Sequence, residues 1–142
     1  MKGKDSSFQC EIKMDLDPSI EKINVIPQDL GRVFLNIYNN AFYSLSEKMK
    51  KQAGGFEPLL FLSSRKSDHK TEIHIRDNGI GIPQKNIDKI FQPFFTTKPT
   101  GQGTGLGLSL AYDIITNEHE GSLRVESVEG EGAEFIIQMP FI

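Results

Sequence analysis

A run of glycines lies directly before an apolar stretch in the last third of the chain. The segment GQGTGLGLSL, residues 101–110, holds four glycines in seven positions, with Thr104 as a candidate N-cap for a following helix. Free backbone N–H groups at a helix N-terminus favour an anion, and missing side chains let that anion approach closely. The spacing fits neither the P-loop nor the dinucleotide-binding motif. Polyphosphate is the candidate ligand. A hinge, or glycines needed for helix packing, is the alternative.

Two asparagines could hold a metal ion. Asn36 and Asn40 are four residues apart and therefore share one side of an expected helix, with Tyr43 and Glu47 one turn further along. Amide oxygens suit Mg²⁺, a hard ion that keeps waters and phosphate oxygens and takes few protein ligands. The alternative is that both amides lie on a solvated helix face.

A carboxylate is followed by a glycine-containing turn. Asp77 ends an expected strand, and the sequence NGIGIP comes directly after it. Gly79 and Gly81 allow the backbone to turn tightly under a planar ligand, and a carboxylate can accept a hydrogen bond from an exocyclic amine such as that of adenine. A plain turn without a ligand is the alternative.

An aromatic segment, FQPFFTTKP, occupies residues 91–99. Its three phenylalanines could anchor a lid, and Thr97 and Lys98 supply a hydroxyl and a cation that could reach a terminal phosphate. The phenylalanines could equally be ordinary core or partner-surface residues.

The elements that must position these groups alternate between helix and strand patterns. Strands are expected at residues 8–16, 22–26, 59–64, 71–77, 122–128 and 133–140, and helices at 27–53, 84–91 and 105–118. The first two strands suggest an N-terminal hairpin. The long helix has an apolar stripe, and the last helix an apolar face made of Leu110, Ala111, Ile114 and Ile115. Together they predict an α+β, two-layer sandwich: a mostly antiparallel sheet with helices on one face.

Composition limits the possible classes of protein. A chain of 142 residues with 37% hydrophobic content fits one domain, and the net charge of −3 argues against nucleic-acid or membrane-surface binding. Cys10 is the single cysteine, which excludes an internal disulfide or a cysteine zinc site. The N-terminus has no apolar signal region, and no run is long enough to span a bilayer. We therefore expect a soluble, cytoplasmic chain.

In this order the blocks resemble the ATP-binding catalytic domain of sensor histidine kinases, within the Bergerat-fold ATPases that include Hsp90, type II topoisomerases and MutL. LGRVFLNIYNNAFYSL resembles the N box, IRDNGIGIP the G1 box, IFQPFFTTKP the F box and GQGTGLGLSLAYDII the G2 box. The resemblance covers residues 7–142 and leaves 1–6 as a residual linker. It implies a mixed sheet of about five strands and three helices.

The resemblance also implies roles for individual residues. Asp77 would hold the adenine amino group, Asn40 with Asn36 would bind Mg²⁺, and Asn36, Asn40 and Lys98 would carry the catalysis. The expected ATP-binding set is Asn36, Asn40, Tyr43, Asp77, Gly79, Gly81, Ile82, Thr97, Lys98, Gly103, Thr104, Gly105, Leu106, Gly107 and Leu108.

Three positions depart from the family pattern. Hydrolysing relatives carry a water-activating Glu where this chain has Asn36, which favours phosphoryl transfer over hydrolysis. Tyr43 stands where many kinases have Lys or Arg, and Ala133 where a Ser or Thr often contacts the adenine region through water. We therefore expect modest ATP affinity.

No histidine fits the phosphoacceptor pattern of sensor kinases. His69, His74 and His119 fall in an expected loop, strand and helix end, and we interpret each as a surface residue. The acceptor histidine is thus expected on a separate dimerisation domain of the same parent kinase, which could be membrane-anchored. We expect a response regulator to act downstream of that kinase, and we expect this segment to be a monomer. The alternatives are a self-sufficient ATPase, a kinase acting on Ser or Thr as in some anti-sigma factors, and a nucleotide-binding interaction module without catalysis.

Overall fold

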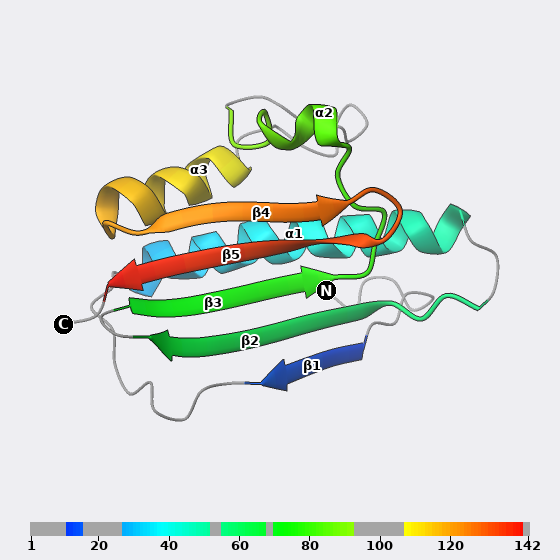
Figure 1. Cartoon of the computed structure of the whole chain (residues 1–142), viewed down its shortest axis with the longest axis horizontal. Helices are drawn as coiled ribbons and strands as arrows, with labels where there is room; N and C mark the ends of the chain where they lie inside the picture. Colours follow the sequence, from blue (N-terminus) through cyan, green and yellow to red (C-terminus); the bar gives the residue numbers. More distant parts are fainter. Residues whose placement is uncertain (1–10, 16–26, 52–54, 68–69, 93–106, 141–142) are drawn as a thin grey trace.

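Five strands form one mixed sheet that the helices cover on one face (Figure 1). The computed structural model describes residues 11–15, 27–51, 55–67, 70–92 and 107–140. The elements are β1 (Glu11–Asp15), α1 (Pro27–Lys51), β2 (Leu59–Ser67), β3 (Lys70–Asp77), α2 (Gln84–Ile87), α3 (Gly107–Asp113), a π-helical turn (Ile114–Glu118), β4 (Ser122–Val128) and β5 (Gly132–Pro140). The predicted two-layer α+β sandwich is confirmed.

The strand order β1-β2-β3-β5-β4 places β3 at the centre of the sheet. β1 runs parallel to β2, and every other pair is antiparallel. In this register Asp77, at the end of β3, lies between Leu60 of β2 and Ala133 of β5. The expected partner of β1 in an N-terminal hairpin, residues 22–26, lies outside the described residues.

The long helix α1 forms because its apolar residues recur every three or four positions and make one continuous stripe. Val33, Ile37, Ala41 and Leu45 are each at most 2% exposed, and they face a core built with β3 and β5. The stripe was predicted from the sequence and is confirmed. Its polar neighbours are thereby held at the border between the core and the solvent.

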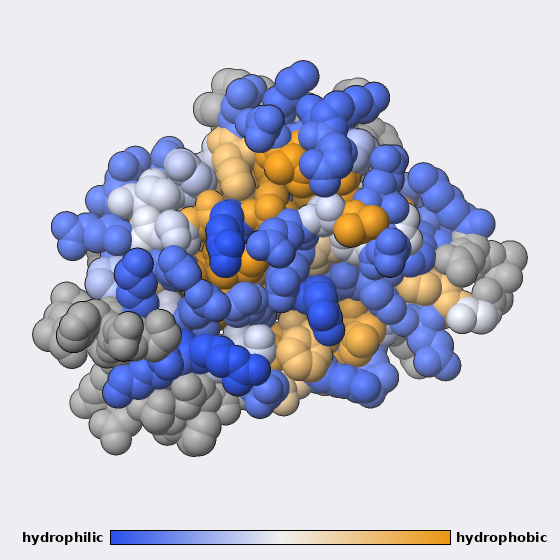
Figure 2. Space-filling model, viewed as in Figure 1, coloured by the Kyte–Doolittle hydropathy of each residue, from blue (hydrophilic) through white to orange (hydrophobic). Residues whose placement is uncertain are grey.

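Successive side chains of each strand point to opposite faces of the sheet, and one of these faces packs on the core. The inward side chains include Ile75, Phe135, Ile137 and Met139, all at most 3% exposed. Figure 2 views the opposite face, with α1 behind the sheet, and shows it covered largely by hydrophilic side chains. Ligand-binding groups carried on α1 therefore lie on the helical side of the molecule.

Several predicted boundaries were wrong. The helix expected at residues 84–91 is limited to Gln84–Ile87, and the β2–β3 hairpin extends through Ser67 and Lys70 into the segment expected to be a loop. In the last helix Ala111 is buried, but Leu110 is 42% exposed. The helix contacts α1 and, through the π-helical turn, β4, so only part of its apolar face is covered. Within the described ranges, no helix has the length and apolar character required to cross a membrane.

Candidate functional site

Asp77 is a buried carboxylate at the point where β3 ends and the chain turns toward α1. Asp77 is only 4% exposed. Asp77 Oδ1 accepts a hydrogen bond of 2.8 Å from the backbone N–H of Gly79 and a long one of 3.5 Å from the Ser44 hydroxyl. The same Ser44 Oγ accepts a 2.9 Å bond from the N–H of Ile80. One hydroxyl of α1 thus contacts both the carboxylate and the turn that follows it.

The ionisation of Asp77 is strongly perturbed. Burial raises its pKa from 3.8 to about 6, although hydrogen bonds from the backbone of Gly79 and Ala133 and from Ser44, and the charge of Lys48, act to lower it. A buried carboxylate whose pKa is raised in this way is a candidate functional group.

The turn after Asp77 needs glycine at two positions. A Cβ on Gly79 would collide with the Ser44 hydroxyl and lie 2.7 Å from the Ser44 carbonyl carbon. Gly81 has φ +74°, and a Cβ there would collide with the carbonyl oxygen of Val128. The next residue, Ile82, donates its N–H to Ser127 Oγ at 2.7 Å. The turn is therefore packed against α1 at Gly79 and against β4 at Gly81, with no room for a side chain at either glycine.

Asn36 and Asn40 lie on α1, both half-buried beside the apolar stripe. Asn40 Nδ2 donates to the backbone carbonyl of Asn36 at 2.9 Å, so its Oδ1 is the amide atom available to a cation. No cluster of three His, Cys, Asp or Glu side chains suited to a metal occurs among the residues that the structure describes. Within that part of the chain, the two amides remain the candidate ligands for a hard cation.

Tyr43 is the next polar residue of interest on α1. Burial and the charge of Glu47 raise the pKa of its hydroxyl, while Lys50 lowers it. A neutral phenol therefore stands where a Lys or Arg was expected from the family pattern.

Gly107 begins α3 directly against α1. A Cβ built on it would lie 3.5 Å from both Cγ and Oδ1 of Asn36. Leu108, the next residue, packs on the core. The first turn of α3 is thus fixed beside the first of the two amides, while the other six lid residues of the predicted set, Thr97, Lys98, Gly103, Thr104, Gly105 and Leu106, lie outside the described residues.

Helix α1 connects these groups in one row. Asn36, Asn40 and Ser44 follow one another at four-residue intervals and therefore share a face. Gly107 lies against Asn36, and Asp77 contacts Ser44. Eight residues of α-helix rise about 12 Å, a length on the scale of a nucleoside triphosphate. The structure thus brings Asn36, Asn40, Asp77, Gly79 and Gly107 along a single helix face.

The residues that hold the turn, Ser44, Lys48 and Ser127, were not predicted from the sequence. Lys48 Nζ donates to the carbonyls of Asn78 at 3.0 Å and Gly130 at 2.9 Å. The four-residue spacing from Asn40 to Ser44 and on to Lys48 was a signal for a shared face. Their partners, in the turn after β3 and in the β4–β5 hairpin, could be identified only from the folded structure.

The histidines are not simple surface residues. His119 is 8% exposed, and its Nδ1 lies 2.9 Å from the carbonyl oxygen of Ile114, so our interpretation of it was wrong. His74 lies between two carboxylates, with Nε2 2.6 Å from Glu72 and Nδ1 3.0 Å from Glu134. His69 lies outside the described residues. Both described histidines are thus engaged within the fold.

Comparison with known proteins decides the family. Residues 25–142 match the family model described as histidine kinase-, DNA gyrase B-, and HSP90-like ATPase. The chain belongs to this ATPase family. Its N-box asparagines, its Asp77 turn and the start of α3 are therefore parts of an ATPase domain, as the resemblance had suggested.

Curated relatives of this ATPase domain include sensor kinases. It is 40% identical over 126 residues to the signal transduction histidine-protein kinase AtoS of Escherichia coli K12, covering 89% of this chain and 19% of the relative. It is 32% identical over 135 residues to sensor histidine kinase ZraS of the same strain, covering 95% of this chain and 26% of the relative. The chain thus spans 26% or less of the length of these relatives.

A solved structure supports the same family. The catalytic domain of histidine kinase ThkA superposes with a TM-score of 0.76 at 29% identity, covering 93% of this chain and 80% of that one. This domain is therefore homologous to the catalytic domains of sensor histidine kinases, with the same mixed sheet and helical layer.

Proposed function

We propose that this domain binds Mg²⁺-ATP along α1 and transfers the γ-phosphoryl group to a histidine on a separate dimerisation domain. The observation that carries the proposal is the row Asn36, Asn40 and Ser44, with Gly107 beside its first member and Asp77 contacting its last. Membership in an ATPase family supports ATP as the nucleotide. The kinase relatives support a protein substrate rather than water.

Adenine recognition would depend on Asp77. Its Oδ1 is directed by the N–H of Gly79 and the Ser44 hydroxyl, and an ionised carboxylate accepts a hydrogen bond from the exocyclic amine of the base. Gly79 and Gly81 allow the turn to pack closely on Ser44 and Val128, and this close packing would hold the backbone of the turn beside the base. Ile82, partly buried against the core, would contribute apolar contact at the border of this region.

The phosphate end would lie between Asn40, Asn36 and the start of α3. Amide oxygens fit Mg²⁺, which when bound neutralises charge on the phosphate oxygens. Gly107 leaves space beside the Asn36 amide. Of the residues outside the described ranges, we propose that Gly103, Thr104, Gly105 and Leu106 donate backbone N–H groups, and that Thr97 and Lys98 contact the terminal phosphate.

The chemistry requires positioning more than covalent catalysis. The lone pair of the acceptor imidazole would form the N–P bond while the bond from the γ-phosphorus to the bridging oxygen breaks, and ADP would leave with that electron pair. The ring proton would pass to a base on the acceptor domain. Asn36 is a neutral amide and cannot activate water as a carboxylate would, which favours transfer over hydrolysis.

The test is a phosphotransfer assay with a matching helical-hairpin acceptor domain. The domain, ATP labelled on the γ-phosphate, and Mg²⁺ are expected to give a label on the acceptor that is labile in acid and stable in base. Exchange of the acceptor histidine for Gln should abolish it. Label stable in acid on Ser or Thr, or release of free phosphate without any acceptor label, would contradict the proposal.

A further inference from the structure

Lys48 is the cation that joins the turn after Asp77 to the β4–β5 hairpin. It lies in the last turn of α1 with Lys50 and Lys51. Its Nζ donates to the carbonyl of Asn78 at 3.0 Å and to the carbonyl of Gly130 at 2.9 Å, and it lies 4.9 Å from the centre of the Phe56 ring. One ammonium group therefore contacts three separate parts of the chain.

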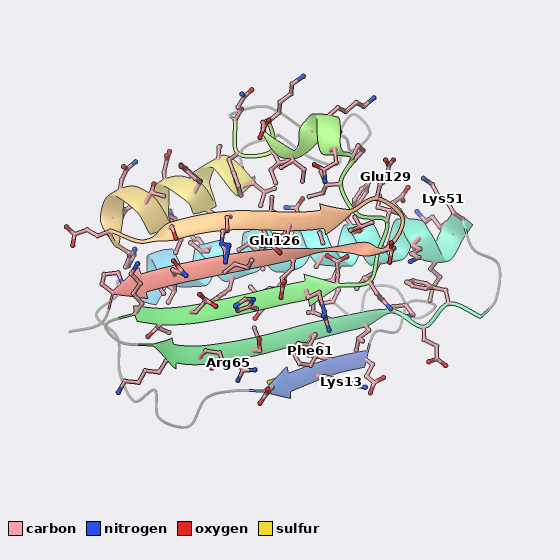
Figure 3. The ribbon with its side chains drawn as sticks, in the orientation of Figure 1. Lys13, Lys51, Phe61, Arg65, Glu126 and Glu129 are labelled. Atoms are coloured by element: carbon pink, nitrogen blue, oxygen red, sulfur yellow. The ribbon has the colours of Figure 1, made fainter. Side chains whose placement is uncertain are left out.

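The hairpin is bonded to the same turn from its other side. Gly130 donates its N–H to the carbonyl of Ile80 at 2.6 Å while its own carbonyl accepts from Lys48. Gly130 has φ +87°, a conformation that favours glycine. Figure 3 shows Glu129 of this hairpin and Lys51 of α1 at the same end of the molecule. The turn, the hairpin and the helix end thus form one hydrogen-bonded unit around the Lys48 ammonium.

This unit includes Asn78, the residue directly after Asp77. Asn78, the residue bonded to Lys48, also accepts from the N–H of Leu59 at 2.8 Å and donates to the carbonyl of Glu57 at 3.1 Å through its side chain. The peptide after Asp77 is therefore held from both directions, by β2 and by α1. Charge-assisted hydrogen bonds are the stronger kind, so Lys48 supplies the firmest of these attachments on the α1 side.

We propose that Lys48 is a positioning residue for nucleotide recognition: its ammonium group fastens the turn after Asp77 to the β4–β5 hairpin and so fixes the carboxylate that would read the base. The inference rests on the proposed function, because it assigns Asp77 to the adenine amine. Lys48 has a second effect on the same carboxylate. Among the described residues, the charge of Lys48 acts on the Asp77 carboxyl and favours its ionised form. Hydrogen bonds from the Ser44 hydroxyl and from the N–H groups of Gly79 and Ala133 act in the same direction.

The experiment compares Lys48→Met with Lys48→Arg and with Lys51→Met in ADP binding by calorimetry. Lys51 is exposed and shares the last turn of α1, so its removal matches the change in charge at the helix end. Lys48→Met should weaken ADP binding about tenfold, as expected for a lost bond to a charged group. Lys48→Arg should recover most of the affinity, and Lys51→Met should bind like wild type. Equal binding by Lys48→Met and Lys51→Met would overturn the inference.

A second measurement separates positioning from general stability. Carbon NMR of the Asp77 carboxyl in the nucleotide-free domain gives its titration midpoint. Loss of the Lys48 cation should move that midpoint to higher pH, because an opposite charge no longer favours the carboxylate, whereas Lys51→Met should leave it unchanged. If wild type binds no nucleotide, the proposed function fails. If wild type binds nucleotide but the titration midpoint of Asp77 is unchanged in Lys48→Met, the proposed function stands and the inference about Lys48 is overturned.

Discussion

Gly107 at the start of α3 lies against the side chain of Asn36 on α1, with space for a methyl group 3.5 Å from the Asn36 amide. The contact joins two segments that are 71 positions apart in the sequence. It places the last glycine of the glycine-rich run next to the Asn36 amide. Helix packing and ligand access are thus two separable explanations of one glycine.

Gly107→Ala distinguishes these explanations. A methyl group at 3.5 Å makes an ordinary contact, and Gly to Ala at a helical position stabilises by about 0.4 to 1 kcal/mol. We expect an unchanged or higher melting temperature together with ATP binding at least about tenfold weaker, because the methyl group would occupy space beside the phosphates. A variant that is destabilised, yet binds ATP normally, would assign the glycine to packing.

Asn40→Ala tests the cation site. It removes the amide oxygen while leaving the buried stripe of α1 intact, and it loses one hydrogen bond, to the carbonyl of Asn36. Removing a group that only hydrogen-bonds to a metal ligand typically lowers metal affinity 10- to 100-fold. Because Asn40 would itself be a ligand, we expect the Mg²⁺-dependent part of ATP binding to fall by roughly 100-fold. Calorimetry with and without Mg²⁺ measures it, with Asn39→Ala as the matched control. Equal Mg²⁺ dependence in both variants would show that Asn40 is not a ligand.

Asp77→Asn should stabilise the nucleotide-free domain while abolishing adenine recognition. Because burial raises the pKa of Asp77 to about 6 from 3.8, the folded state holds this proton more tightly than the unfolded state. Stability attributable to Asp77 is therefore lost as pH rises from about 4 to 6, by roughly 3 kcal/mol at neutral pH. The neutral amide avoids that loss and keeps an acceptor for the Gly79 N–H.

The measurement is thermal unfolding of wild type and Asp77→Asn at several pH values. The variant should melt at higher temperature above pH 6 and near the wild-type value below pH 4. Its ATP binding should be lost at every pH. A variant that is less stable than wild type at pH 8 would show that the ionised carboxylate is a structural group.

Isolated turnover should be very slow. The residue one helical turn before Asn40 is Asn36, an amide without the basicity needed to activate water. In the proposed reaction the acceptor imidazole is on another domain. We expect steady-state ATP hydrolysis well below the ordinary enzyme range of roughly 1 to 10³ per second. The ATP hydrolysis rate of wild type is compared with that of an Asn36→Glu variant, which has a carboxylate at this position. Wild-type hydrolysis within that ordinary range would contradict the assignment of this domain to phosphoryl transfer.

Local patterns in the sequence were sufficient to predict most of the helices and strands of the fold. The stripe from Val33 to Leu45 follows directly from the periodicity of a helix, and the strands expected at residues 71–77 and 133–140 are present as β3 and β5. The parallel pairing of β1 with β2, and the exposure of Leu110, depend on which elements become neighbours. Such choices are set by tertiary packing, which a short segment does not encode by itself.

The candidate site was predictable where spacing implied a shared face, as for Asn36 and Asn40. The same spacing extends to Ser44 and Lys48, but their roles depend on the turn at Asn78 and on Gly130, which lie 30 and 82 positions away from Lys48. Likewise, the perturbed pKa of Asp77 arises from burial between β2 and β5, which a strand-end position alone does not reveal.

The most direct test of the account is an experimental structure of the domain with Mg²⁺ and a non-hydrolysable ATP analogue. The account predicts the adenine amine within hydrogen-bonding distance of an Asp77 oxygen, the cation on the Asn40 amide oxygen, and the phosphates between Asn36 and the backbone before Gly107. A nucleotide bound away from this face of α1, or one whose base contacts neither Asp77 nor the turn after it, would contradict the account.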